Sequence, residues 1–166
     1  MRNREREITD RTEIDAILAG TKVVRVAFAV GNDPYVVPLS HGYDPDAGAL
    51  YVHTAVEGRK IDCIAANPRV CFEVEGDARV KEGDERACSW GVRFESVIGH
   101  GTIREIVDAP ERERALLRIM RQQSGREANW TFADKVLRRT RLWAIEIESV
   151  TGKRSGSPRR TAEPTT

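Results

Sequence analysis

The sequence predicts a mainly β protein, an antiparallel β-barrel with helices added to it. Its β-rich segments follow one another as hairpins joined by turns rich in Gly, Asn, Asp and Pro, such as GNDP at 31–34 and DPDAG at 44–48. The predicted helices do not alternate regularly with the strands, as they would in a parallel sheet. Successive antiparallel strands of this kind commonly close into a barrel.

The expected elements follow in order along the chain. We expect helices over 10–20, 58–66, 109–125 and, more briefly, 130–139, and strands over 22–30, 35–43, 49–55, 69–80, 94–107 and 141–153. Asp10 with Glu13 forms a capping-box pattern, and Asp108 with Glu111 forms another. In the helix after Gly58, we expect Ile61, Ile64 and Ala65 to face inward.

Several residues within the strands predict local features. Pro38 cannot donate a ladder hydrogen bond, so it is expected at an edge or a bulge. Gly99 and Gly101 interrupt a long strand, which indicates bending or the close approach of another group. In the last strand, a period of two places Trp143 and Ile145 on one face with Ile147.

Size and charge predict one cytoplasmic domain. The chain has 166 residues, with 27 basic against 26 acidic ones, which argues against nucleic acid as the main partner. No segment approaches the roughly 20 apolar residues of a membrane span, and the charged N-terminus lacks the apolar region of a secretory signal. Three cysteines without motif spacing fit a reducing compartment. The domain is expected over 1–153, followed by a disordered polar tail over 154–166.

The stretch from His53 to Pro68 carries the clearest functional signal. A strand ends at His53 and Thr54, and a helix then opens with Gly58, Arg59 and Lys60. Cations are disfavoured at a helix N-terminus, whereas an anion bound there would explain them. The alternative is an ordinary exposed turn in which Glu57 caps together with Thr54, and the local sequence leaves both interpretations open.

Metal binding and nucleotide-loop motifs are not expected. The three histidines and three cysteines lack the close spacing of a structural zinc site. No P-loop or G-x-G-x-x-G pattern occurs, and the basic segment near the C-terminus is interpreted as a solvated tail.

Five stretches in order resemble the FMN-binding split-barrel superfamily of pyridoxamine 5′-phosphate oxidase, and within it the nitroimidazole-resistance (Nim) proteins. They are REITD, PYVVPLSHGYD, LYVHTAVEGRKIDCIAANPRVCFEV, ESVIGHGTI and LWAIEIESVTGK, and they cover roughly 5–153. The resemblance implies a six-stranded antiparallel Greek-key split barrel. It also implies a homodimer with FMN at the subunit interface.

The resemblance also implies the roles of particular residues. Arg59 and Lys60 after Gly58 would hold the FMN phosphate, assisted by Thr54, and His53 would be the site residue of the LYxHxA motif. Two segments would run along the isoalloxazine ring or ribityl chain: Arg25, Val26 and Ala27, and Val37, Pro38 and Leu39. Ser96 and Val97 would approach from the partner subunit.

The implied function is an FMN-dependent oxidoreductase. A nicotinamide nucleotide or another reductant would reduce the flavin, which would pass electrons to a small acceptor such as a nitroaromatic. His53 is interpreted either as a proton donor or as an anchor of the strand end. The oxidase's C-terminal substrate segment has no counterpart here, which argues against oxidation of vitamin B6.

Two other cofactors stay open at this point. A non-catalytic carrier or sensor on the same fold would bind flavin or haem, with His41, His53 or His100 as an axial ligand to the haem. A deazaflavin could also take the place of FMN.

Overall fold

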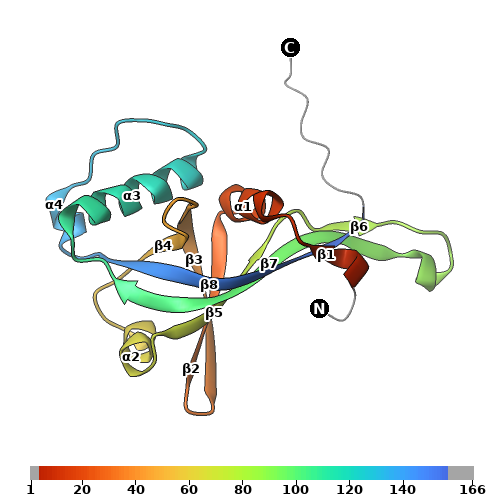
Figure 1. Ribbon diagram of the computed structural model, residues 1–166, viewed down its shortest axis with the longest axis horizontal. Helices are drawn as coiled ribbons and strands as arrows, with labels where there is room; N and C mark the ends of the chain where they lie inside the picture. The colour runs from red at the N-terminus through yellow and green to blue at the C-terminus, as the bar shows by residue number, and fades with distance from the viewer. Residues whose placement is uncertain (1–3, 157–166) are drawn as a thin grey trace.

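Six strands close into a barrel in the computed structural model, which describes residues 4–156 (Figure 1). They are β2 (Val23–Val30), β3 (Asp33–Asp44), β4 (Ala49–Thr54), β5 (Arg69–Glu75), β7 (Gly91–Glu105) and β8 (Arg141–Ser155). Their order is β8-β4-β3-β2-β5-β7, and β7 pairs again with β8 to close the ring, with every pairing antiparallel. Because β5 returns to lie beside β2 after the β2-β3-β4 meander, the topology is a Greek key. The predicted fold class is confirmed.

Two short strands, four helices and two 3₁₀ turns lie outside the six barrel strands among the described residues. A short strand, β1 (Glu7–Ile8), pairs with the end of β8, and β6 (Arg79–Lys81) pairs with the start of β7. The helices are α1 (Arg11–Gly20), α2 (Arg59–Ala66), α3 (Ala109–Ser124) and α4 (Asp134–Leu137), with 3₁₀ turns η1 (Arg4–Arg6) and η2 (Ala87–Ser89). Two predicted elements were too long: the strand over 69–80 breaks into β5 and β6, and the helix over 130–139 forms only as α4.

The barrel interior is filled by alternate residues of the strands. Val24, Val26 and Phe28 of β2 point inward and pack with the inward faces of β5 and β8, where Phe72 and Trp143 lie. Since successive side chains of a strand point to opposite faces, this alternation also decides which side chains face outward. Trp143 and Ile145 are buried in this core and Ile147 packs against it, as predicted.

Helix α2 packs on the barrel through two of the three residues that were predicted to face inward, Ile61 and Ile64. Cys63 and Ile64 are buried and Ile61 is half-buried, but Ala65 is exposed. The contact face is therefore centred between Cys63 and Ile64, and the prediction for Ala65 was wrong.

Helix α3 forms a second layer over the outer surface of β3 and β4 (Figure 1). Ala115 and Ile119 are its buried residues and pack on a second cluster that contains Tyr51 and Leu142. The helix begins at its predicted cap, because the Asp108 carboxylate accepts from the Glu111 N–H at 3.0 Å.

The end of the domain differs from the predicted boundary at residue 153. Strand β8 continues through Ser155, because Arg154 pairs with Glu95 in register and its guanidinium contacts the Glu13 carboxylate at 2.6 Å. Glu13 is therefore used by Arg154, while Asp10 alone caps α1 by accepting from the Thr12 N–H. The predicted tail beyond residue 156 lies outside the described residues.

Pro38 occupies the kind of edge that the sequence predicts. Strand β3 pairs with β2 up to Ser40 but pairs with β4 only from His41 onward. At Pro38 the side of β3 that faces away from β2 has no neighbour among the described strands. The missing N–H therefore leaves no ladder bond unmade.

His41 is buried where α1 and α3 meet β3. Its side chain is fully buried, and its Nε2 lies 3.1 Å from the Leu18 carbonyl oxygen and 2.9 Å from the Gln122 Nε2 atom. Burial lowers the pKa of His41 below its ordinary value of 6.5. The folded protein therefore holds this imidazole neutral.

This burial predicts a pH-dependent stability. A histidine whose folded pKa is lowered stabilises the fold fully above its unfolded pKa, and that contribution is lost as the pH falls below it. We expect the melting temperature to decline from about pH 7 to about pH 5, and His41→Gln to decline less steeply. His100→Gln, at an exposed position, is the control and should keep the wild-type slope. Equal slopes for His41→Gln and the wild type would contradict this account.

Candidate functional site

The N-terminus of α2 lacks a side-chain cap among the described residues. Gly58 precedes the helix with φ of 124°, which disfavours any other residue. Its carbonyl oxygen accepts the first helical bond, from the Ile61 N–H at 2.8 Å, so the Arg59 and Lys60 N–H groups precede the ladder. Helices α1 and α3 instead begin at aspartate caps. The start of α2 thus combines uncapped N–H donors with two cationic side chains, an arrangement suited to an anion.

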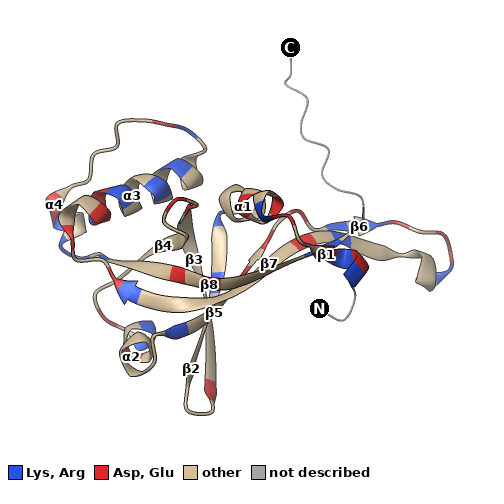
Figure 2. Ribbon diagram, in the orientation of Figure 1, with Lys and Arg blue, Asp and Glu red and all other residues tan. Residues whose placement is uncertain are grey.

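Arg59 is held against the β2–β3 hairpin. Its Nη2 atom lies 2.7 Å from Asp33 Oδ2, and its guanidinium lies 4.4 Å from the centroid of the Tyr35 ring. Figure 2 shows basic residues on α2 close to this hairpin. The Arg59–Asp33 pair is exposed, so it is weak and can exchange for another anion. Lys60 forms no ion pair with any described residue.

His53 and Thr54 lie on opposite faces of β4. The Thr54 hydroxyl is buried, donates to the Ala55 carbonyl at 2.7 Å and accepts from the Trp143 indole N–H at 2.9 Å. The hydroxyl proton of Thr54 is therefore already engaged and is not available to a phosphate. Thr54 also does not form the alternative capping box with Glu57. His53 is exposed and lies opposite Leu142 in register.

Trp143 joins Thr54 to a charged cluster that the sequence did not indicate. The Arg141 guanidinium lies 4.8 Å from the centroid of the Trp143 ring and forms two hydrogen bonds with the Glu105 carboxylate. These bonds lower the pKa of Glu105. The cluster arises from the pairing of β4, β7 and β8, so no local pattern could have indicated it.

The two predicted ring-binding segments lie side by side. In the β2–β3 ladder Arg25 is opposite Pro38 and Val26 is opposite Val37, while Leu39 is opposite Val24. Arg25 and Pro38 are exposed and Ala27 is half-buried, but Val26 is buried in the core and Val37 and Leu39 pack against it.

The Val26 side chain is fully buried and cannot contact a ligand outside the barrel. Only the main chain of such a residue could reach it. The Arg25 guanidinium is also engaged, at 2.9 Å from Glu73 and 3.7 Å from Glu75.

Ser96 and Val97 lie apart from the other predicted residues of the same chain. They belong to β7, which β5 separates from β2. Val97 is buried in the core, whereas Ser96 is half-buried on the outer side of the strand. The structure therefore joins α2 to the β2–β3 hairpin through Arg59 but leaves Ser96 and Val97 two strands away.

The histidines do not form a common site. His41 is buried and contacts Leu18 and Gln122, while His53 and His100 are exposed on β4 and β7. Within residues 4–156 no group of three or more His, Cys, Asp or Glu residues could hold a metal ion. No helix in this range is long and apolar enough to cross a membrane.

The fold and this arrangement define a known class of protein. The chain belongs to the pyridoxamine 5′-phosphate oxidase family, whose model matches residues 10–154. A comparison with curated proteins gives no match.

Solved structures share the fold. One, from Bacteroides thetaiotaomicron, is provisionally described as a 5-nitroimidazole antibiotic resistance protein; it is 28% identical, with a TM-score of 0.76 over 89% of this chain and 85% of that one. A FAD-binding protein from Mesorhizobium loti is 26% identical, with a TM-score of 0.65 over 91% and 98%. A FAD- and haem-binding protein from Mycobacterium smegmatis, 19% identical over 95% and 77% with a TM-score of 0.74, shares the fold alone.

Proposed function

We propose that the protein is an FMN-dependent oxidoreductase that passes electrons to a small acceptor such as a nitroaromatic. The observation that carries the proposal is the start of α2, where uncapped N–H groups meet Arg59 and Lys60. Two similar proteins support the proposal, since one is described as FAD-binding and the other as a nitroimidazole resistance protein. Three free cysteines fit a reducing compartment, and we place the activity in the cytoplasm.

The chain's own residues bind and orient the cofactor in this proposal. Arg59, Lys60 and the N–H groups at the start of α2 would hold the phosphate, and Arg59 would exchange Asp33 for it. The outward surface of β2 and β3, with Ala27 and Pro38, lies along the flavin. Two chains form a homodimer, and Ser96 and the main chain of Val97 come from the partner.

The electron transfer itself is the chemistry of the cofactor. When bound, FMN supplies the capacity to take electrons from a reductant such as a nicotinamide nucleotide and to pass them on. His53, whose side chain is exposed near the end of β4, donates a proton to the acceptor in this proposal.

Replacing His53 by alanine tests this role. Turnover of a nitroaromatic with a nicotinamide nucleotide should fall by about 10²-fold or more, because a positioned acid contributes about that much. The amount of flavin bound per chain should not change. His100→Ala removes another exposed histidine and should keep wild-type turnover. Wild-type turnover in His53→Ala would contradict the catalytic role and favour the strand-anchor interpretation.

A further inference from the structure

The tip of the β2–β3 hairpin projects from the barrel as a two-stranded ribbon (Figure 1). Strand β2 pairs with β3 from Val23 to Val30, but it pairs with β5 only from Arg25 to Ala27. On its other side, β3 pairs with β4 only from His41 onward. The ribbon beyond Ala27 therefore has no neighbouring strand on either side among the described residues. A ribbon of this kind is only marginally stable in water and can adjust without disturbing the barrel.

Helix α2 holds this ribbon at both ends of the helix. At its N-terminal end, Arg59 Nη2 lies 2.7 Å from Asp33 Oδ2, and the Arg59 guanidinium lies 4.4 Å from the centroid of the Tyr35 ring. At its C-terminal end, the Asn67 side-chain amide donates to the Ala29 carbonyl oxygen at 2.9 Å. The Asn67 contact would therefore keep the ribbon attached to α2 if Asp33 moved away from Arg59.

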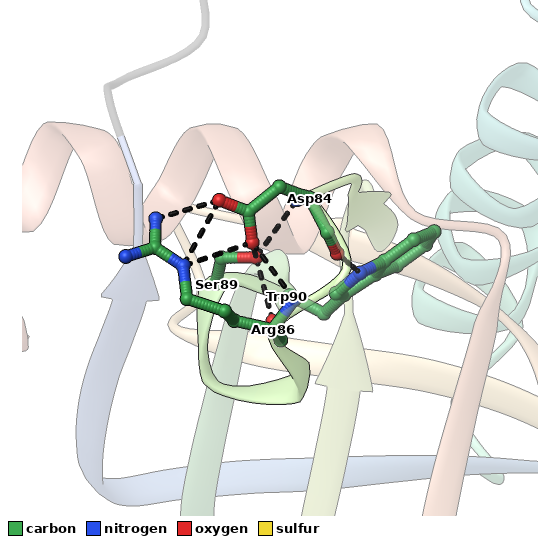
Figure 3. Close-up of polar contacts among 4 residues, drawn as sticks. All are labelled: Asp84, Arg86, Ser89 and Trp90. Atoms are coloured by element: carbon green, nitrogen blue, oxygen red, sulfur yellow. Dashed lines mark hydrogen bonds and ion pairs between the residues drawn. The ribbon is translucent and has the colours of Figure 1, made fainter.

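Asp33 is held by fewer contacts than another exposed carboxylate, that of Asp84 in the loop between β6 and β7. The Asp84 carboxylate accepts from the Arg86 N–H at 2.9 Å, from the Arg86 guanidinium at 2.6 Å and from the Ser89 hydroxyl at 2.9 Å (Figure 3). Among the described residues, the Asp33 carboxylate accepts a hydrogen bond from Arg59 alone. The side chains of Asp33 and Arg59 are 73% and 56% exposed. Asp33 can therefore exchange Arg59 for water at a small cost in free energy.

The balance of charge at the start of α2 depends on where Asp33 lies. Beside Arg59, its carboxylate offsets one of the two cations, Arg59 and Lys60. A phosphate monoester carries a charge of about −1.5 to −2 near neutral pH, so both cations are needed to balance it. A carboxylate that stayed beside a bound phosphate would also repel it. Simultaneous binding of both anions to Arg59 is therefore unfavourable.

We infer that Asp33 is an internal competitor for the phosphate, so that its carboxylate and the phosphate of a flavin bind Arg59 in turn. The inference rests on the phosphate site of the proposed function and adds a residue that sets the selectivity of that site. A flavin without a phosphate, such as riboflavin, leaves the Arg59–Asp33 pair intact. Asp33 therefore weakens the binding of FMN but not that of riboflavin, and it narrows the preference of the site for the phosphorylated form.

Asp33→Asn tests this role, with Glu113→Gln as the matched control. Asparagine keeps the size of the side chain and removes its charge. Titration of the apo proteins, followed by flavin fluorescence, should give an FMN dissociation constant about 2- to 5-fold lower for Asp33→Asn, because no ion pair has to be broken. The riboflavin dissociation constant should not change. Glu113→Gln removes the same charge at an exposed position of α3 and should keep the wild-type affinity for both flavins.

A double variant shows whether the effect acts through Arg59. Arg59→Gln removes the cation for which the two anions compete, so Asp33 then has no partner to give up. Adding Asp33→Asn to Arg59→Gln should therefore leave the FMN affinity of the single Arg59→Gln variant unchanged. A gain in FMN affinity of the same size with and without Arg59 would contradict competition for this side chain.

The outcomes separate this inference from the proposed function. Suppose that Arg59→Gln weakens FMN binding, but Asp33→Asn binds FMN only as tightly as the wild type or less tightly. That result would overturn the competitor and leave the phosphate site in place. An equal gain for FMN and riboflavin in Asp33→Asn would also overturn it, because the effect would not depend on the phosphate. Wild-type FMN affinity in the Arg59→Gln/Lys60→Gln protein would overturn the phosphate site and the competitor together.

Discussion

Gly42→Ala is expected to lower the stability of the fold by about 2–3 kcal/mol, or about 5–10 °C in melting temperature. A Cβ atom on Gly42 would lie 2.4 Å from the backbone nitrogen of Ile119 and 2.5 Å from the backbone carbon of Arg118. Backbone atoms cannot rotate away, so the whole of α3 would have to shift. That shift would also loosen Gln122, whose side-chain oxygen accepts from the Tyr43 N–H at 2.7 Å.

Gly91→Ala is the matched control for this change. A Cβ atom on Gly91 has no heavy atom within 4 Å, and Gly91 is also a strand residue. Its melting temperature should equal or slightly exceed that of the wild type, because alanine reduces the entropy of the unfolded chain. Thermal unfolding followed by circular dichroism measures both variants. Equal melting temperatures for Gly42→Ala and the wild type would mean that α3 does not pack on β3 as closely as described.

Replacing Arg59 and Lys60 together by glutamine is expected to weaken FMN binding by a factor of about 100 or more. Hydrogen bonds to charged groups contribute about 1.5–3 kcal/mol each, and the double change removes two charged donors. The fold should persist, because the Arg59–Asp33 pair is exposed and such pairs contribute at most about 1 kcal/mol. Affinity of the wild type should also weaken with added salt.

Arg138→Gln with Arg139→Gln is the control for the loss of charge. These two neighbouring residues follow α4, are both exposed, and carry the same total charge as Arg59 and Lys60. The apo proteins would be titrated with FMN and followed by flavin fluorescence. The FMN affinity of the control double variant should equal that of the wild type and should exceed that of the Arg59→Gln/Lys60→Gln protein by a factor of about 100 or more. Wild-type affinity in the folded Arg59→Gln/Lys60→Gln protein would place the phosphate elsewhere.

The barrel could be predicted from the sequence where its signals are local. Turn residues between β-rich segments indicated the hairpins, and two glycines indicated close approach. A Cβ atom would lie 2.2 Å from the Phe72 ring if placed on Gly99, and 2.1 Å from the Glu146 carbonyl oxygen if placed on Gly101. These contacts confirm the prediction for both residues.

Features that depend on distant residues could not be predicted in this way. The tail boundary was misplaced because Arg154 is polar and its partner Glu13 is 141 positions away. The break between β5 and β6 occurs at Gly76, where a Cβ atom would lie 2.6 Å from the Glu95 side chain. A short stretch of sequence shows neither that β7 packs beside Gly76 nor that Arg154 pairs with Glu13.

In the candidate site, too, the residues that are adjacent in sequence could be predicted and their distant partners could not. Gly58, Arg59 and Lys60 are adjacent in sequence, so their combination at a helix start was visible directly. The partners of Arg59 could not be seen in this way, because Asp33 and Tyr35 contact it only in the folded chain. Thr54 likewise contacts Trp143, which is 89 positions away.

The identity of the bound cofactor tests the central proposal most directly. Purified protein would be denatured, and the released small molecule would be identified by mass and by its absorption spectrum. The proposal predicts the mass of FMN, twin flavin absorption bands and a stoichiometry near one per chain. Haem with a Soret band, a deazaflavin, or protein that neither carries nor takes up FMN would contradict it.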